Sequence, residues 1–440
     1  MNKYFGTDGV RGSYGSAIMN ESFAQKFGLA IGAFLIRKSG SNPQVLIGRD
    51  TRPSGASLKN SLIKGLLATG CRVLDSGIVP SPALAFGVLH YRADFGVMIT
   101  ASHNPYHDNG IKCFSQKGTK LLPECEILIE QLIDQQPEHC SPKGGAESVD
   151  LIDNYCSHFN TLFPKNGLKG LNIALDLANG ATSETTPRIL KSMGATVFCS
   201  HFGDGLINDN CGSEYLTSLQ SMVRLKDADL GIAHDGDGDR VRFVDPIGNI
   251  VDGDQVLGLL ALHAHQSNQL DNATFVSTVH SNTGLKRSLN KRGISLATAD
   301  VGDRNVFLKM LELKTNWGGE SSGHIIGTDY LPTGDGLIAA LMILGAIQQN
   351  KRSIRQLADE ILLWPAISKA FPIRDKIPFN QIPHLCETLM SEESKVGEDG
   401  RILLRYSGTE AKVRLLVEGE QKDWVQESFK KIQEILEKSL

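Results

Sequence analysis

The feature that most constrains the fold is an internal repeat. The segments "ADFGVMITAS", from Ala93, and "ADLGIAHDGD", from Ala228, share an Ala-Asp start, an apolar run and a polar end. A degenerate third copy ends in "TNWGGESSGH", from Thr315. Each copy follows earlier apolar runs and a helical pattern, which together form a right-handed βαβ unit. The whole repeats begin at Val45, Leu171 and Ala273, more than 100 residues apart. That spacing is too wide for a solenoid, so the repeat predicts three related domains.

The C-terminal part departs from this repeat. A proline-punctuated stretch, "LLWPAISKAFPIRDKIPF", is typical of a linker. After it, "GRILLRYSGTEAKVRLLVEG" predicts two strands around a polar turn, and "DWVQESFKKIQEILEKSL" predicts an amphipathic helix. The predicted fold is therefore α/β, with three related βαβ-containing domains of mixed, mostly parallel sheets and a C-terminal α+β domain. We expect these domains to cover residues 1–150, 151–250, 251–366 and 367–440.

Composition excludes several classes of partner. The net charge of −4 provides no basic field for nucleic acid. The N-terminal stretch lacks the apolar core of a signal peptide, and the longest apolar run, "LIAALMILGAI" from Leu337, is too short for a bilayer and predicts a buried helix. The eight cysteines are scattered with no C-x-x-C pair, which indicates a reducing compartment. We therefore expect a cytoplasmic protein with neither a nucleic-acid nor a membrane partner.

The "DGDGDR" loop is a candidate metal site. If the segment is extended, its period of two places Asp235, Asp237 and Asp239 on one side, where a hard cation such as Mg²⁺ or Ca²⁺ relieves their repulsion. An EF-hand is excluded, because Arg240 stands where its glycine belongs and Pro246 where its glutamate belongs. A plain Gly-Asp turn is the alternative, but such a turn needs no third aspartate.

The "TASHNP" loop is a candidate phosphoryl carrier. Taken alone, Ser102 is typical of a turn or helix cap, and no G-x-S-x-G motif surrounds it. The repeat, however, aligns this loop with the metal loop, since ligands bind beyond the carboxyl ends of strands in such sheets. His103 is a base, a hydrogen-bond donor or a solvated loop residue. Lys112 follows an Asn-Gly pair, and we expect a tight turn there to fold it back towards Ser102.

Two further loops have the chemistry of a sugar phosphate site. In "GGESSGH", Glu320 and Ser322 suit neighbouring sugar hydroxyls, and His324 is an acid, a base or a packed histidine. The loop "RYSGTEAKVR" combines hydroxyls, a glycine backbone and two guanidiniums, which is typical of a phosphate cradle, although an ordinary hairpin is an equal alternative. Its candidate residues are Arg405, Ser407, Gly408, Thr409 and Arg414.

In this order the four loops resemble the α-D-phosphohexomutase family, over essentially the whole chain. "TASHNP" with "DGDGDR" is a highly specific pair, and "YFGTDGVRG", "VGDRNV" and "TGDG" are most similar to the bacterial members that act on glucosamine phosphates. The resemblance implies interconversion of glucosamine 6-phosphate and glucosamine 1-phosphate, on the route to UDP-N-acetylglucosamine and the cell wall. Thr100 and Ser321 depart from the usual motifs, at positions that we expect to bear on sugar preference.

The resemblance also implies residue roles. Ser102 is the phosphoserine, whose phosphoryl oxygen joins the three aspartates on Mg²⁺, while Glu320 and Ser322 hold sugar hydroxyls. The cradle residues of the fourth loop hold the phosphate that is not reacting. Lys112 is the expected general acid or base, although the identity of the base stays open. The other residues implied near the reacting groups are Arg11, His103, Arg240 and His324.

The implied mechanism passes through a sugar bisphosphate. Phosphoserine donates its phosphoryl group to the free hydroxyl of a sugar monophosphate, the bisphosphate reorients, and its other phosphate returns to Ser102. A sugar bisphosphate is therefore also the expected activator. The alternatives are a phosphoglucomutase or phosphomannomutase of the same family, a phosphoserine-dependent phosphatase, or a non-catalytic sugar-phosphate sensor. The expected partner is a small sugar phosphate, and a homodimer stays open.

Overall fold

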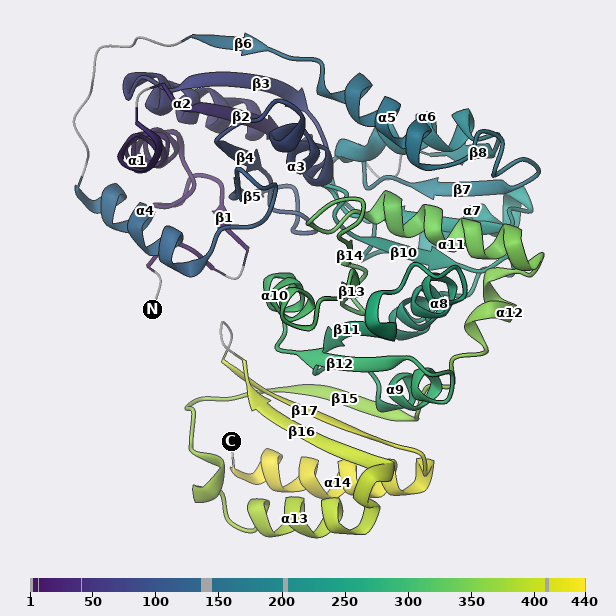
Figure 1. Cartoon of the computed structure of the whole chain (residues 1–440). Coiled ribbons are helices and arrows are strands. Elements are labelled where there is room, and N and C mark those ends of the chain that lie inside the picture. The colour runs from purple at the N-terminus through teal and green to yellow at the C-terminus, as the bar shows by residue number, and fades with distance from the viewer. Residues whose placement is uncertain are drawn as a thin grey trace. The chain divides into compact units, whose positions relative to one another are not determined.

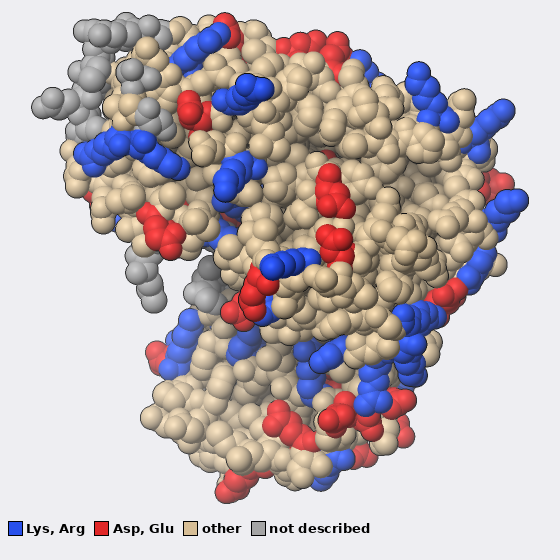
Figure 2. Space-filling model, viewed as in Figure 1, with Lys and Arg blue, Asp and Glu red and all other residues tan. Residues whose placement is uncertain are grey.

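A computed structural model of the chain describes residues 3–6, 8–40, 42–135, 145–200, 205–407 and 411–439. The chain divides into two compact units: residues 1–279 with 297–358, and residues 280–296 with 359–440 (Figure 1). The four expected domain boundaries stay a prediction. Within the described ranges, no helix combines the length and apolarity needed to span a membrane. Basic and acidic side chains are interspersed on the face shown in Figure 2.

The first sheet has six strands in the order β1-β5-β4-β2-β3-β6. The pairs β1/β5 and β5/β4 are antiparallel, and the other neighbours are parallel. Its strands are β1 (Val10–Ser13), β2 (Gln44–Arg49), β3 (Arg72–Ile78), β4 (Phe95–Ile99), β5 (Asp108–Ser115) and β6 (Ala146–Ser148). The helices of this part are α1 (Glu21–Ser39), α2 (Gly55–Ala68), α3 (Ser81–His90) and α4 (Pro123–Gln135).

The second and third sheets repeat the centre of the first. Their orders are β10-β9-β7-β8 and β14-β13-β11-β12, which match β5-β4-β2-β3 strand for strand. The predicted repeat of α/β layers with mixed, mostly parallel sheets is therefore confirmed. The strands are β7 (Asn172–Asp176), β8 (Thr196–Cys199), β9 (Leu230–His234), β10 (Val241–Val244), β11 (Thr274–Thr278), β12 (Ser295–Ala299), β13 (Trp317–Gly319) and β14 (Ile325–Gly327).

The helices of these two layers alternate with their strands along the chain. They are α5 (Leu151–Leu162), α6 (Thr185–Ser192), α7 (Thr217–Lys226), α8 (Gly253–Gln266), α9 (Thr283–Asn290), α10 (Asp303–Leu313), α11 (Gly336–Asn350) and α12 (Ile354–Ala358). The apolar run from Leu337 lies in α11 and is buried, as predicted. Short 3₁₀ turns cover η1 (Ala181–Ser183) and η2 (Asp271–Ala273).

Apolar patterning explains where the core of the first unit lies. Every residue of β4 and of β9 is buried, as expected for central strands covered on both faces. Helices α1 and α2 approach closely at Gly28 and Gly65. A Cβ on Gly28 would lie 2.2 Å from the Leu62 carbonyl oxygen, and one on Gly65 would lie 2.1 Å from that of Gln25. This contact packs the second half of α2 against α1.

The C-terminal unit has an antiparallel sheet in the order β15-β17-β16. Its strands are β15 (Ala366–Pro372), β16 (Gly400–Tyr406) and β17 (Lys412–Gly419), with α13 (Leu385–Val396), α14 (Lys422–Ser439), η3 (Phe379–Gln381) and η4 (Gly397–Asp399). The predicted α+β module is confirmed. The linker prediction is wrong over β15, because Pro372 ends an edge strand, where a missing N–H is tolerated.

Candidate active site

The repeat brings the chemistry-bearing residues to equivalent strand ends. Ser102 lies three residues past the end of β4, Asp235 directly follows β9, and Glu320 directly follows β13. The Ser102 hydroxyl donates a hydrogen bond of 2.5 Å to Oδ2 of Asp235. Both side chains are almost completely buried. All three loops therefore lie at the equivalent strand ends that the repeat predicts, and the first two are in direct contact.

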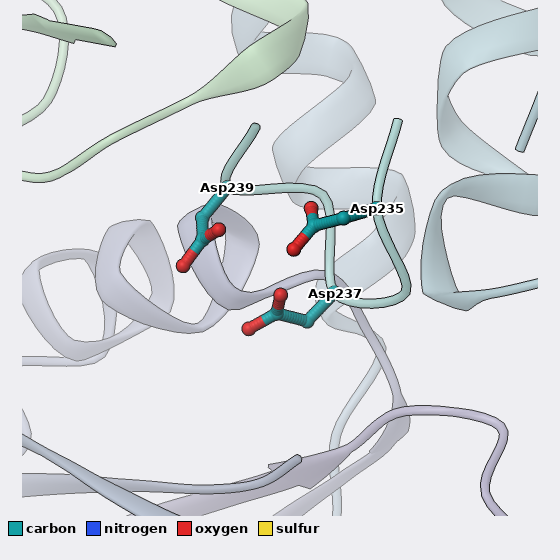
Figure 3. A group of neighbouring side chains, drawn as sticks. All are labelled: Asp235, Asp237 and Asp239. Carbon is teal, nitrogen blue, oxygen red and sulfur yellow. The ribbon is translucent and has the colours of Figure 1, made fainter. Parts of the chain in front are cut away.

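The three aspartates converge through a turn (Figure 3). Residues 235–240 are not extended, so the predicted reason for their convergence is wrong. Gly238 has φ +76°, and the Asp235 carboxylate accepts hydrogen bonds from the backbone N–H groups of Gly238 and Arg240, at 3.1 and 3.2 Å. One carboxylate oxygen each from Asp235, Asp237 and Asp239 lie within 4.8 Å of one another, and all three residues are buried.

Lys112 reaches this carboxylate cluster from β5. The Asn-Gly pair before it lies within the strand, so the predicted tight turn is wrong; antiparallel pairing of β5 with β4 places Lys112 opposite Met98. The Lys112 ammonium lies 2.7 Å from Asp237 and 2.7 Å from Asp239. Burial opposes its charge, but these carboxylates raise the pKa of Lys112 well above its usual range.

The donor set fits a hard divalent cation. The site consists of carboxylate oxygens, which Mg²⁺ prefers. Oδ1 of Asp237 is buried and has no hydrogen-bond partner among the described residues, so it is available to a ligand. Burial, together with the neighbouring carboxylates of Asp239 and Asp237, raises the pKa of Asp235 well above its usual range. A divalent cation would relieve this repulsion.

A chain of alternating charges extends from the cluster. The Asp8 carboxylate lies 2.6 Å from Arg11, 3.1 Å from Lys112 and 2.5 Å from Lys120. Lys120 also forms an ion pair with Asp303. Burial opposes its charge, yet Lys112 and Lys120 hold the pKa of Asp8 well below its usual range. Arg11 is therefore brought to the site, through an aspartate that sequence reasoning did not single out.

His324 lies between two carboxylates. Its Nε2 is 3.1 Å from Asp303, and its Nδ1 is 3.7 Å from Asp239. Burial would favour the neutral ring, but the Asp303 and Asp239 carboxylates raise the pKa of His324 to about 10. The imidazolium is therefore a donor and a positive charge at neutral pH.

His103 has the opposite electrostatic environment. Its Nδ1 lies 3.5 Å from the Ser102 hydroxyl. Burial and the Arg240 guanidinium lower the pKa of His103 to about 4, so the ring is neutral at neutral pH. Arg240 is mostly buried and lies 3.6 Å from the Glu214 carboxylate.

The third loop presents partly exposed polar groups. Glu320 is half-buried and accepts a hydrogen bond of 3.0 Å from the Gly302 amide, while Ser322 is also half-buried. Thr100, in contrast, is fully buried, and its hydroxyl donates to Asp50 and accepts from the Ser102 amide. Both hydrogen-bonding roles of Thr100 are thus occupied inside the protein, beside Ser102. That Thr100 and Ser321 bear on sugar preference stays a prediction.

The C-terminal unit carries the cationic residues of the fourth loop. Arg405 and Arg414 face each other across β16 and β17, and Ser407 is buried. Two residues that sequence reasoning missed lie beside them: His280 Nε2 is 2.7 Å from Arg405, and the Lys376 ammonium donates to the Ser407 carbonyl at 2.9 Å. The remaining predicted cradle residues, Gly408 and Thr409, lie outside the described residues.

Several other site residues were not identified from the sequence. Asp8 and Asp303 lie inside motifs quoted for the resemblance, "YFGTDGVRG" and "VGDRNV", so a signal was present. Lys120, Asp50 and Arg52 stand in no such motif. Their partners are distant in sequence, and a lone charged residue is most often solvated.

Comparison with known proteins gives a consistent picture. Four family descriptions match in order: phosphoglucomutase/phosphomannomutase alpha/beta/alpha domains I, II and III at residues 2–139, 153–248 and 252–363, and the C-terminal domain at residues 389–435. The chain is 41% identical over 444 residues to phosphoglucosamine mutase of Desulforamulus reducens, covering 99% of both chains. It is 42% identical over 447 residues to phosphoglucosamine mutase of Haemophilus influenzae, again covering 99% of both.

A solved structure shows the same fold. The putative phosphomannomutase of Thermus thermophilus superposes with a TM-score of 0.81, at 23% sequence identity, over 99% of each chain.

Proposed function

This chain belongs to the phosphoglucomutase/phosphomannomutase family, and on that premise we propose that it interconverts glucosamine 6-phosphate and glucosamine 1-phosphate. It is an enzyme that transfers a phosphoryl group within a sugar phosphate. The choice of glucosamine is supported by relatives named phosphoglucosamine mutase that match over the full chain. The expected substrate is a small sugar phosphate in the synthesis of UDP-N-acetylglucosamine, and the expected compartment is the cytoplasm.

The observation that carries the proposal is the contact between Ser102 and the acidic loop. The hydroxyl lies 2.5 Å from the Asp235 carboxylate, inside a cluster that also holds Asp237, Asp239 and the Lys112 ammonium. A hydroxyl carrying a phosphoryl group there meets fixed positive charge and a site suited to a divalent cation. Mg²⁺ bound by the three aspartates would neutralise charge on the phosphoryl oxygens.

The remaining residues have distinct proposed roles. Ser102 carries the phosphoryl group, and its hydroxyl attacks the bisphosphate when the group returns. Lys112 and His324 are both positively charged at neutral pH, so they stabilise negative charge and donate protons in this state of the site. Glu320 and Ser322 orient sugar hydroxyls. Arg405, Ser407 and Arg414, with Gly408 and Thr409, hold the phosphate that is not reacting.

The route requires a bisphosphate intermediate. The phosphoserine P–O bond breaks as the free sugar hydroxyl forms a new P–O bond, which leaves Ser102 as a hydroxyl. After reorientation the other phosphate transfers back to Ser102 and releases the isomer. The same Ser102 oxygen must therefore serve both half-reactions, and a trace of sugar bisphosphate restores enzyme that has lost its phosphoryl group.

The test is isomerisation of glucosamine, glucose and mannose 6-phosphates in parallel, with Mg²⁺ and a trace of the matching bisphosphate. A clear preference for glucosamine 6-phosphate supports the proposal. Preference for glucose or mannose overturns the substrate assignment and keeps the mechanism. Release of inorganic phosphate indicates a phosphatase. Absence of turnover with Ser102 phosphorylated indicates a sugar-phosphate sensor.

A further inference from the structure

The backbone at Ser102 adopts a conformation that side chains other than glycine rarely take. Its φ is +54°, in the left-handed region. Both backbone polar groups of Ser102 are held in place. Its N–H donates to Thr100 Oγ1 at 2.9 Å, and its carbonyl accepts from Arg52 at 2.9 Å and from Asn208 at 2.7 Å. Such a conformation persists only where the surroundings fix it.

Arg52 holds the carbonyl side of Ser102 together with Asn208, and it also holds the residues that follow. Its side chain is completely buried, and all five of its guanidinium N–H groups are engaged. Nε donates to Asp50 Oδ2 at 3.0 Å. The other four N–H groups donate at 2.5 to 2.9 Å to backbone carbonyls of the loop after β4 and of the first residue of β5, those of Ser102, Asn104, Pro105 and Asp108.

Asp50 joins the two sides of this arrangement. Its carboxylate accepts from the backbone N–H and Nε of Arg52, each at 3.0 Å, and from the Thr100 hydroxyl at 2.6 Å. One route from Asp50 passes through Thr100 to the Ser102 N–H. The other passes through Arg52 to the Ser102 carbonyl. The peptide groups on both sides of Ser102 are thus linked to the same buried carboxylate, and Asn208 holds the carbonyl side as well.

We propose that Arg52, anchored by Asp50, is a positioning residue that holds Ser102 so that its oxygen points at Asp235, with Thr100 as the second arm. This inference rests on the proposed function, because a serine that both gives and receives a phosphoryl group must return its oxygen to one place. Displacement by about 1 Å can slow such transfers by about 10²-fold. Neither Arg52 nor Thr100 touches the reacting atoms.

The competing account is that a buried arginine only stabilises the domain. Leu62→Ala is the matched control, because Leu62 is a fully buried core residue on α2, and its truncation lowers stability without touching the Ser102 loop. The other variants are Arg52→Met, Arg52→Lys, Thr100→Val and Thr100→Ser. Thr100→Val keeps the shape and removes the hydroxyl, whereas Thr100→Ser keeps the hydroxyl.

The experiment loads Ser102 with a phosphoryl group from a sugar bisphosphate and follows its loss by intact mass in a single turnover. Glucosamine 6-phosphate is the acceptor in one arm, and water alone in the other. We expect Arg52→Met to slow transfer to the sugar by about 10²-fold. Arg52→Lys, with fewer donors, is expected to retain part of the rate. Thr100→Val should slow transfer about tenfold, as for one lost hydrogen bond, and Thr100→Ser should restore it.

The ratio of transfer to sugar over loss to water separates positioning from stability. We expect this ratio to fall in Arg52→Met and Thr100→Val, and to stay at the wild-type value in Leu62→Ala at a comparable loss of melting temperature. Rates and ratios within about twofold of wild type in both loop variants would overturn the proposal. If Arg52→Met does not fold, the proposal is tested by comparing this ratio between Thr100→Val and Thr100→Ser.

Failure of the proposed function has a different signature. In that case the wild-type phosphoenzyme itself does not transfer to glucosamine 6-phosphate. We then measure the rate at which the sugar bisphosphate phosphorylates Ser102, in place of the rate of transfer to glucosamine 6-phosphate. Wild-type phosphorylation at the same rate as in Arg52→Met and Thr100→Val would overturn positioning, and slower phosphorylation in both variants would support it.

Discussion

The first and second repeats each have a buried aspartate at the end of one strand and a functional loop after the neighbouring strand. The two loops are held in place in different ways. Asp50 follows β2 and Asp176 ends β7, and both carboxyls are fully buried. Asp50 binds Arg52, which holds the Ser102 loop from outside. The loop after β9 is instead folded around its own Asp235 carboxylate. The Ser102 loop is therefore held by a side chain from another segment, whereas the loop with the three aspartates is held by hydrogen bonds within itself.

The largest effect is expected when the hydroxyl oxygen of Ser102 is removed. Ser102→Ala should lower mutase activity by about 10³-fold or more, because no phosphoryl carrier remains. The measurement is isomerisation of glucosamine 6-phosphate together with intact mass after incubation with sugar bisphosphate. Activity near wild type would show that Ser102 is not the carrier.

The second prediction concerns the three carboxylates of the loop after β9. Asp237→Asn should lower activity by about 10²-fold and raise the Mg²⁺ concentration needed for half-maximal rate, since one carboxylate of the cluster is lost. Asp245→Asn is the matched control, a fully buried aspartate directly after β10 that accepts from the Ile247 and Asn249 amides. Equal Mg²⁺ dependence in both variants would contradict the metal assignment.

A third prediction tests how the second loop is fixed from within. A Cβ on Gly238 would lie 2.3 Å from Thr182 Cγ2, at φ +76°. Gly77 has φ +70° with no atom within 4 Å of its Cβ position, so Gly77→Ala measures the backbone penalty alone. We expect Gly238→Ala to be about 2–3 kcal/mol less stable than Gly77→Ala, from urea unfolding. Equal stability of the two variants would show that the turn can relax.

A fourth prediction concerns the buried carboxyl of the second repeat. Burial raises the pKa of Asp176 to about 6, partly offset by the amides of Gly212 and Ala178. The folded state therefore binds a proton that the unfolded chain has lost, so this contribution to stability is present below about pH 4 and disappears as pH rises through about 6. Relative to Asp176→Asn, the wild type should lose on the order of 2 kcal/mol between pH 4 and 7.

Hydrogen exchange at the Ala178 and Gly212 amides, corrected for the intrinsic pH dependence of exchange, reports this change locally. Wild-type and variant protection that vary in parallel with pH would refute the raised pKa.

The smallest expected effect measures the strain in the first loop. Glycine adopts φ +54° without penalty, so Ser102→Gly should be more stable than Ser102→Ala by about 1 kcal/mol, although both lack the hydroxyl. Urea unfolding of the two variants gives the difference. A Ser102→Ala protein as stable as Ser102→Gly would indicate that the loop relaxes when the hydroxyl is removed.

Much of the fold was predictable, because apolar runs and their repetition specify strands and their order. The local geometry was less so. The three aspartates were expected to converge along an extended segment, but a turn at Gly238 brings them together. Lys112 was expected after a tight turn, but strand pairing with Met98 returns it to the site. In both cases the prediction that these side chains come together is confirmed, but the predicted backbone conformation is wrong.

The residues that sequence reasoning missed share one property. Arg52 acts on carbonyl groups about 50 residues away. Asp303 pairs with Lys120 of the first repeat and with His324, just before β14 in its own repeat. A local pattern cannot distinguish such an arginine from a solvated one, because its burial depends on distant chain segments. The edge strand β15 was read as a linker for the same reason, since its partner β17 lies 40 residues further on.

The most direct test of the account follows one phosphoryl group. Enzyme radiolabelled at Ser102 is mixed with unlabelled glucosamine 6-phosphate and Mg²⁺, and the reaction is stopped within a single turnover. We expect the label to leave the protein and to appear first in glucosamine bisphosphate and then in glucosamine monophosphate, at rates that match isomerisation. Isomerisation that proceeds while the label stays on Ser102 would contradict this expectation.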